Sequence, residues 1–215
     1  MTDAPRVALT FDVEHPDRPH HGAHAEWVLD ELARAEVPAT LFLQGRWVEA
    51  HPDLARRSAA DGHLIGNHSH YHVRMPLLSP SGFDEDVRTA EAVIRDVTGA
   101  DPRPWFRFPF GAGADDPALH ERLDALEYRH VGWDVELYEW EPGRTPREIA
   151  DAVVNGVAAR DDDTIVLLHS WPDAVAPGLS DAIDRLRDRG ARFVRIDALE
   201  LVAAPAQPVP GEPAA

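Results

Sequence analysis

Two short segments of the chain carry side chains of the kinds that bind metal ions. Residues 66–72 read GNHSHYH, which places His68 and His72 four positions apart. In a helix such a pair shares one face, where two imidazoles can bind one ion. Because the chain has 12 histidines, such a cluster can also arise by chance. The alternative is therefore a solvated loop whose imidazoles bind no metal. The metal hypothesis therefore needs a carboxylate from elsewhere, because the chain contains no cysteine.

That carboxylate is available in the segment TFDVEH, residues 10–15. The preceding apolar residues 7–11 predict a strand. At the end of this strand Asp12 and Glu14 project to one side, while Val13 projects to the other. The carboxyl ends of parallel strands are where α/β proteins collect ligands. One carboxylate can thus bind a metal while the other accepts a proton.

The elements that must position these residues alternate along the chain, as short apolar segments and longer amphipathic ones. Strands or extended segments are expected at residues 7–11, 38–42, 63–66, 107–109, 129–133, 164–169 and 193–196. Helices are expected at residues 23–35, 48–60, 81–97, 145–157 and 182–189. Ser81 and Thr145 are the expected N-caps of two of them. This alternation predicts an α/β fold with a parallel sheet or barrel.

Composition narrows the class of protein and its partners. The 215 residues, 44% of them hydrophobic, fit one domain at residues 1–203, followed by a disordered Pro/Ala-rich tail at 204–215. A net charge of −17 disfavours nucleic acid and anionic membranes as partners. Since no leader or membrane span is visible, we expect a cytoplasmic protein acting on a small or intracellular substrate. We also expect a monomer. If the natural chain carries a leader, a secreted or cell-wall location is expected instead.

Five segments, in order, resemble the motifs of the polysaccharide deacetylases, the NodB homology family or carbohydrate esterase family four. TFDVE resembles the first motif, TFDDG, and HSHYH resembles the second, H-[S/T]-x-x-H. RFPFG, the EW at 139–140 and the LLH at 167–169 are similar to the other three. The resemblance implies a distorted (β/α) barrel of about seven units. It also implies a metal-dependent hydrolase that removes an N-acetyl or O-acetyl group from an amino sugar or polysaccharide.

The first motif departs from the family, because Val13 stands where the family carries a metal-binding aspartate. We therefore assign the third ligand to Glu14, as in family branches with D-x-E, and keep His15 as an alternative. The resemblance then implies one divalent transition metal ion held by Glu14, His68 and His72. Zinc is expected, with cobalt, nickel or manganese as alternatives.

The resemblance also implies roles for residues near the metal. Asp12 is the expected general base, and Arg107 pairs with it. His169 is the expected general acid, with a strand-end histidine that only makes hydrogen bonds as the alternative. Glu139 is expected to tune His169, although the family carries aspartate both there and at the position of Glu136.

Four further residues are expected to contact the substrate. By resemblance, the Phe110 backbone N–H helps to bind the oxyanion, and Leu167 lines the acyl pocket. Trp140 is expected to wall the sugar groove, and Trp171 is expected to stack on a sugar ring. Two other functions stay open: a hydrolase of small non-sugar amides, like the allantoinase-like relatives, and a catalytically silent carbohydrate-binding domain.

Overall fold

The structure is a computed structural model that describes residues 5–15, 21–160 and 162–199. Its strands are β1 Arg6–Val13, β2 Thr40–Leu43, β3 Leu64–Asn67, β4 Trp105–Phe106, β5 Arg129–His130, β6 Thr164–His169 and β7 Arg192–Phe193. Its α-helices are α1 His21–Arg34, α2 Gly45–Ala50, α3 Pro52–Ala60, α4 Pro80–Thr98, α5 Pro117–Ala125, α6 Pro146–Ala158 and α7 Val175–Asp188. None of these helices is both long and apolar enough to cross a lipid bilayer.

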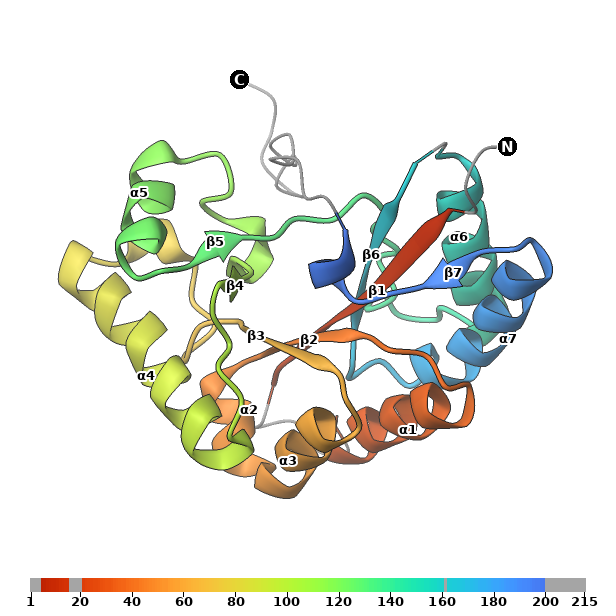
Figure 1. Ribbon diagram of the computed structural model, residues 1–215, viewed down its shortest axis with the longest axis horizontal. Coiled ribbons are helices and arrows are strands. Elements are labelled where there is room, and N and C mark those ends of the chain that lie inside the picture. Colours follow the sequence, from red (N-terminus) through yellow and green to blue (C-terminus); the bar gives the residue numbers. More distant parts are fainter. Residues whose placement is uncertain (1–4, 16–20, 161, 200–215) are drawn as a thin grey trace.

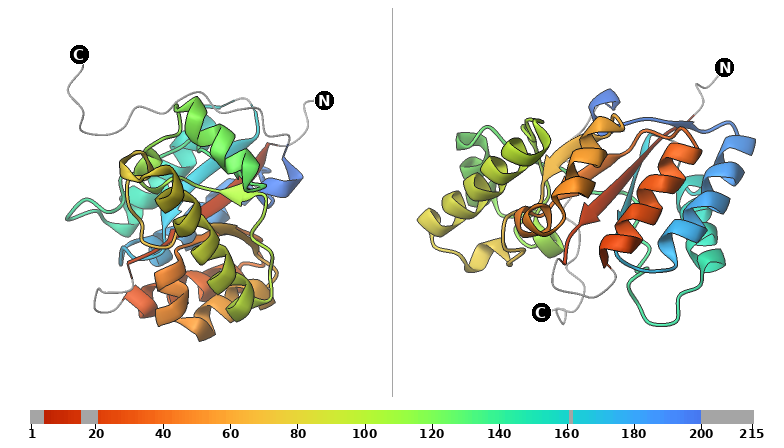
Figure 2. Two further views of the ribbon diagram at one scale, coloured as in Figure 1. Left: turned by 90° about the vertical axis from the view of Figure 1, so that its left-hand side faces the viewer. Right: turned by 90° about the horizontal axis from the view of Figure 1, so that it is seen from below.

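The strands of the described residues form one parallel sheet in the order β5-β4-β3-β2-β1-β6, and β7 also pairs with β1. This sheet curls into a half-barrel whose helices pack around its outer side (Figure 1). Seen from below, α1, α3, α4 and α7 lie along this outer side (Figure 2). The predicted α/β fold, a distorted barrel of about seven units, is confirmed.

Strand β1 is the centre of the sheet, and its side chains alternate between two environments. Val7, Phe11 and Val13 belong to the main apolar cluster, which they share with residues of α1, α6 and α7. Asp12 projects to the other side. In the sheet register it lies opposite both Phe42 of β2 and His169 of β6. The carboxyl ends of β1, β2 and β6 are therefore brought to one edge.

Helix α4 begins earlier than expected, because Ser79 caps it and Pro80 occupies its first turn. Pro80 occupies the first turn, where its fixed φ and missing N–H cost nothing. Ser79, not Ser81, is the N-cap, and its hydroxyl accepts the Gly82 N–H at 3.1 Å. The expected cap Thr145 of α6 is confirmed, since it forms a complete capping box with Glu148.

The single helix expected at residues 48–60 is wrong, because α2 and α3 are separate. His51 lies between them with φ −130° and ψ 56°. A residue that precedes proline is disfavoured in the α conformation, and Pro52 follows directly. The Pro52 ring then starts α3.

The strand expected at residues 129–133 is also wrong beyond His130. The carbonyls of Val131 and Gly132 accept hydrogen bonds from the Arg107 guanidinium, at 3.1 and 3.2 Å, rather than from a neighbouring strand. An interior side chain thus replaces the strand ladder there, and this ends β5 after two residues.

Other elements also differ from the sequence expectations, and β4 ends at Phe106, before the extended segment expected at residues 107–109. Helix α7 begins at Val175 rather than at residue 182, and β7 ends at Phe193 instead of continuing to residue 196. Helix α5 was not expected at all; Asp116 caps it by accepting the Ala118 N–H at 2.9 Å. The predicted tail at 204–215 lies outside the described residues, as does the end of the predicted domain.

Candidate functional site

The end of β1 presents two buried carboxylates to one imidazole. Asp12 Oδ2 lies 3.4 Å from His68 Nε2, and Glu14 Oε2 lies 3.5 Å from the same nitrogen. Asp12 and Glu14 are 4% and 3% exposed, so neither carboxylate is solvated. The alternation along β1 that was expected from the sequence thus brings them to the same side. Two anions that converge without bulk water favour a positive charge between them.

The histidine segment after β3 is a loop, so His68 and His72 are brought together without a shared helical face. Ser69 and His72 adopt left-handed backbone conformations, with φ 62° and φ 55°. The Asn67 side chain accepts the Ser69 N–H, and the Ser69 hydroxyl accepts the His72 N–H, each at 2.9 Å. These local bonds fold the chain back so that both imidazoles face Glu14.

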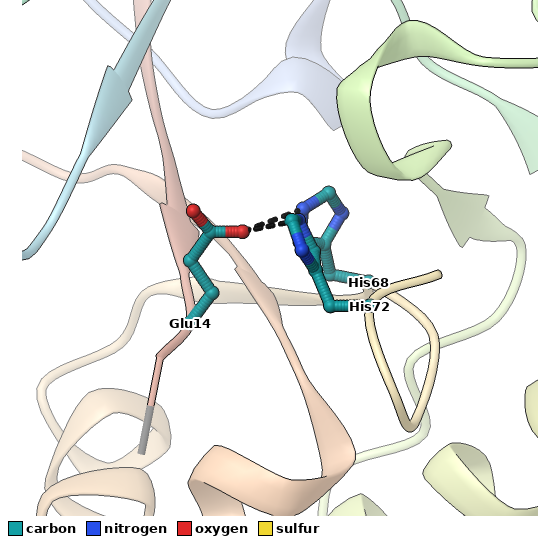
Figure 3. A group of neighbouring side chains, drawn as sticks. All are labelled: Glu14, His68 and His72. Atoms are coloured by element: carbon teal, nitrogen blue, oxygen red, sulfur yellow. Dashed lines mark ion pairs between the residues drawn. The ribbon is translucent and has the colours of Figure 1, made fainter. Parts of the chain in front are cut away.

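Glu14, His68 and His72 form the group of the described residues that can hold a metal ion, with one ligand atom each and all ligand atoms within 4.8 Å of one another (Figure 3). His72 Nε2 makes an ion pair with Glu14 Oε2. His68 Nδ1 donates to the Arg107 carbonyl at 2.9 Å, which leaves Nε2 as a lone-pair donor. Glu14 Oε2 and His68 Nε2 are buried without a well-formed hydrogen bond to any described residue. The donor set therefore fits a divalent transition metal.

The second carboxylate oxygen of Glu14 points away from these imidazoles. The Trp171 indole N–H donates to Glu14 Oε1 at 3.1 Å, and His15 Nε2 lies 2.9 Å from it. His15 thus contacts the back of the carboxylate and is not part of the three-residue group. Burial alone would raise the pKa of Glu14, but the neighbouring imidazoles outweigh it and hold the pKa well below its usual value. Glu14 is therefore an anion that can offer one oxygen to a metal.

Asp12 is held by a buried ion pair that spans the sheet. Its Oδ1 accepts a hydrogen bond from Arg107 Nη1 at 2.9 Å, and the Arg107 side chain is fully buried. The Arg107 guanidinium also lies over the Phe42 ring, 4.1 Å from its centroid. Burial lowers the pKa of Arg107 although Asp12 opposes this shift. The pairing expected from the motif resemblance is present. It leaves Asp12 Oδ2 directed at His68 Nε2.

His169, at the end of β6, is oriented by Glu139. Glu139 Oε1 accepts both the His169 backbone N–H at 2.6 Å and the Nδ1–H at 2.8 Å. Nε2 therefore faces the site, 4.0 Å from Glu14 Oε1. Burial acts to lower the pKa of His169, but the Glu139 carboxylate raises it to about 9. The imidazole thus has a proton to donate at neutral pH.

These groups open into a cavity of about 260 Å³. All four residues expected to contact substrate line it, namely Phe110, Leu167, Trp140 and Trp171. Glu136, whose role was left open, lines it as well, and burial raises its pKa. Three more lining residues were not expected from the sequence: Arg74, Gly111 and Trp133, which opens the WDVELYEW segment.

Comparison with known proteins agrees with the motif resemblance. The sequence profile of the polysaccharide deacetylase family matches residues 1–131. The chitooligosaccharide deacetylase of Sinorhizobium fredii is 32% identical over 204 residues, which cover 88% of this chain and 89% of that protein. The peptidoglycan-N-acetylglucosamine deacetylase of Bacillus cereus is 28% identical over 198 residues, which cover 90% of this chain and 67% of that protein.

The fold is also shared with solved structures. The peptidoglycan deacetylase PdaC from Bacillus subtilis superposes with a TM-score of 0.77 at 26% sequence identity, over 92% of this chain and 90% of that one. The T48 deacetylase, solved with substrate, gives a TM-score of 0.77 at 27% identity, over 90% and 89% of the two chains. Together with the family profile over the first 131 residues, these likenesses show that the chain belongs to the polysaccharide deacetylase family.

Proposed function

We propose that the chain is a metal-dependent deacetylase that hydrolyses the N-acetyl group of an amino sugar in a glycan. The observation that carries this proposal is that three sets of side chains meet at one cavity: the metal ligands, a carboxylate and a protonated imidazole. The proposed metal ligands, called the metal group, are Glu14, His68 and His72. The carboxylate is that of Asp12, and the imidazole is that of His169. The named relatives support the substrate class, because one acts on peptidoglycan and another on chitooligosaccharide.

The residues present can move the two protons that amide hydrolysis requires. Asp12 Oδ2 accepts a proton from the attacking water, and Arg107 holds the carboxylate in place for that step. As the C–N bond breaks, His169 Nε2 donates its proton to the departing nitrogen, while Glu139 stabilises the imidazolium. The products are acetate and a free amine. A divalent ion bound at the three ligands would supply Lewis-acid polarisation of the amide carbonyl and of the water.

Two imidazoles and one carboxylate are typical of a catalytic zinc site, which keeps a further coordination position open. We propose zinc as the metal, with cobalt, nickel and manganese as alternatives that the same donor set accepts. Replacing His68 by alanine removes one ligand and should abolish stoichiometric metal binding. His51, which lies at the junction of α2 and α3, provides the matched control, since His51→Ala should bind metal normally.

The substrate contacts of the proposal follow from the lining of the cavity. Leu167 is 2% exposed and borders the cavity, as expected for a wall of the acyl pocket. Trp140 and Trp171 each lie edge-on to the His169 ring, at centroid distances of 4.9 and 6.1 Å. A sugar ring stacked on either indole would therefore lie beside the proton donor. The Phe110 backbone, left-handed with φ 59°, is the proposed site of the oxyanion donor.

An acetate-release screen tests the function. The substrates are chitooligosaccharides, peptidoglycan, acetylated xylan and small cyclic amides, each assayed with and without chelator. We expect release from the N-acetylated glycans, loss of release with chelator, and recovery when metal is added back. Glycan binding without any acetate release would identify a silent carbohydrate-binding domain instead. Hydrolysis of the small amides alone would favour the allantoinase-like function.

A further inference from the structure

Arg74 is an exposed cation at the edge of the cavity. It follows the metal-ligand loop, residues 68–72, and precedes the 3₁₀ turn Met75–Leu77. Its side chain lines the cavity. Its guanidinium carbon lies 4.8 Å from the centroid of the Phe110 ring. The next residue, Met75, is fully buried and anchors the backbone beside it. Arg74 is thus attached to a fixed part of the loop although its side chain reaches solvent.

The same Phe110 ring connects Arg74 to the metal group. The His72 ring lies 4.5 Å from Phe110, centroid to centroid. The Arg74 guanidinium and the His72 imidazole are therefore within about 10 Å of each other. That separation is within reach of one amino-sugar residue whose acetamido group points at the metal and whose neighbouring substituent points at Arg74.

Apart from its contact with the Phe110 ring, the Arg74 guanidinium has no charged partner among the described residues. Among the described residues that line the cavity, Arg74 is the only arginine, and no carboxylate of the described residues forms an ion pair with it. The cavity carboxylates have other partners: Asp12 binds Arg107, Glu14 contacts the imidazoles, and Glu136 bonds to aromatic side chains. An overall charge of −17 would otherwise repel an anionic glycan.

We infer that Arg74 selects an acetylated amino sugar that carries a carboxylate next to its acetamido group. This inference rests on the proposed deacetylase function and specifies its substrate class. A guanidinium can bind a carboxylate through two parallel hydrogen bonds, which a neutral hydroxyl or amide cannot match. The Phe110 ring beneath the guanidinium restricts its orientation and favours such a paired contact.

The test compares two glycans that differ only in charge: peptide-free peptidoglycan strands, and the same strands with the sugar carboxylate converted to an amide. For the wild type, we expect kcat/KM to be about tenfold higher on the charged strands, as one partly exposed charge-assisted contact would give. Arg74→Gln should remove this preference, so that its kcat/KM is the same for the charged and the amidated strands within about twofold. Arg88→Gln, which removes an exposed positive charge from α4 outside the cavity, should keep the preference.

Binding of the two strands, measured by calorimetry, separates this inference from the deacetylase proposal because it requires no turnover. Tighter binding of the charged strands by the wild type but not by Arg74→Gln supports the inference even if no acetate is released. Equal binding and equal kcat/KM of both strands in the wild type would overturn it while leaving deacetylation intact. A preference that Arg74→Gln and Arg88→Gln reduce equally would assign it to net charge and also overturn it.

Discussion

Replacing Asp86 tests how the metal-ligand loop is held in place. Asp86 lies on α4 and is 4% exposed. Its two carboxylate oxygens accept the backbone N–H groups of His70 and Tyr71, at 2.8 and 3.1 Å. These two residues lie between His68 and His72, so one carboxylate clamps the middle of the loop. We expect Asp86 to position the metal ligands although it contacts neither the metal group nor the cavity.

The magnitude follows from the two bonds. An asparagine at position 86 can accept only one of the N–H groups, which costs about 2 kcal/mol for the lost charge-assisted bond. An alanine leaves both donors without a partner and should cost about 4 kcal/mol. Because the bonds hold ligands from behind, we also expect metal affinity to fall about 10- to 100-fold in Asp86→Asn.

Two measurements separate positioning from simple destabilisation. Metal affinity is obtained by competition with a chromophoric chelator at a temperature where the variant is folded, and the unfolding free energy is obtained by denaturant titration of the metal-free protein. Asp84→Asn is the matched control, because Asp84 is also on α4 but pairs with Arg122 at 2.7 Å. Asp86→Asn with wild-type metal affinity would refute the positioning role, whatever its stability.

Three other outcomes are expected. Asp12→Asn should abolish turnover and keep metal bound, as measured by activity and metal analysis; loss of the metal would make Asp12 a ligand. Glu139→Gln should lower the pKa of His169 from about 9, so the alkaline limb of the pH–rate profile should move to lower pH; an unmoved limb would assign it to another group. Burial holds the pKa of His130 at about 3, so the native state keeps it neutral while the unfolded chain binds a proton below about pH 6.5. Unfolding titrations should therefore show wild type losing about 1.4 kcal/mol per pH unit relative to His130→Gln as pH falls from 6 to about 4, and parallel curves would contradict this.

Local signals in the sequence were sufficient for the parts of the site that depend on neighbouring residues. Strand alternation correctly predicted that Asp12 and Glu14 share one side of β1, because it follows from covalent geometry. The Thr145 capping box was also correct. Two errors had local signals that were available: Pro80 indicated the true start of α4, and Pro52 indicated the break before α3.

The loop that carries the imidazoles could not be predicted from spacing. The four-residue separation of His68 and His72 is compatible with a helix or a loop, and the structure has a loop built on left-handed residues and side-chain hydrogen bonds. Asp86 clamps this loop from a helix that follows it in the sequence. No local pattern specifies that clamp, because the partner is chosen by how α4 packs against the sheet.

By itself the sequence determined the α/β alternation, the order of the motifs and the sidedness of β1, since each depends on residues close together along the chain. Only the tertiary structure decided which partner each buried group has. Arg107 meets Asp12 across the sheet, and Glu14 divides its two oxygens between the metal group and Trp171. It also placed Arg74 at the cavity, where it forms no ion pair with a carboxylate of the described residues. The physical reason is that a buried charge is stabilised by whatever the folded chain places within a few ångströms, and sequence distance does not report that proximity.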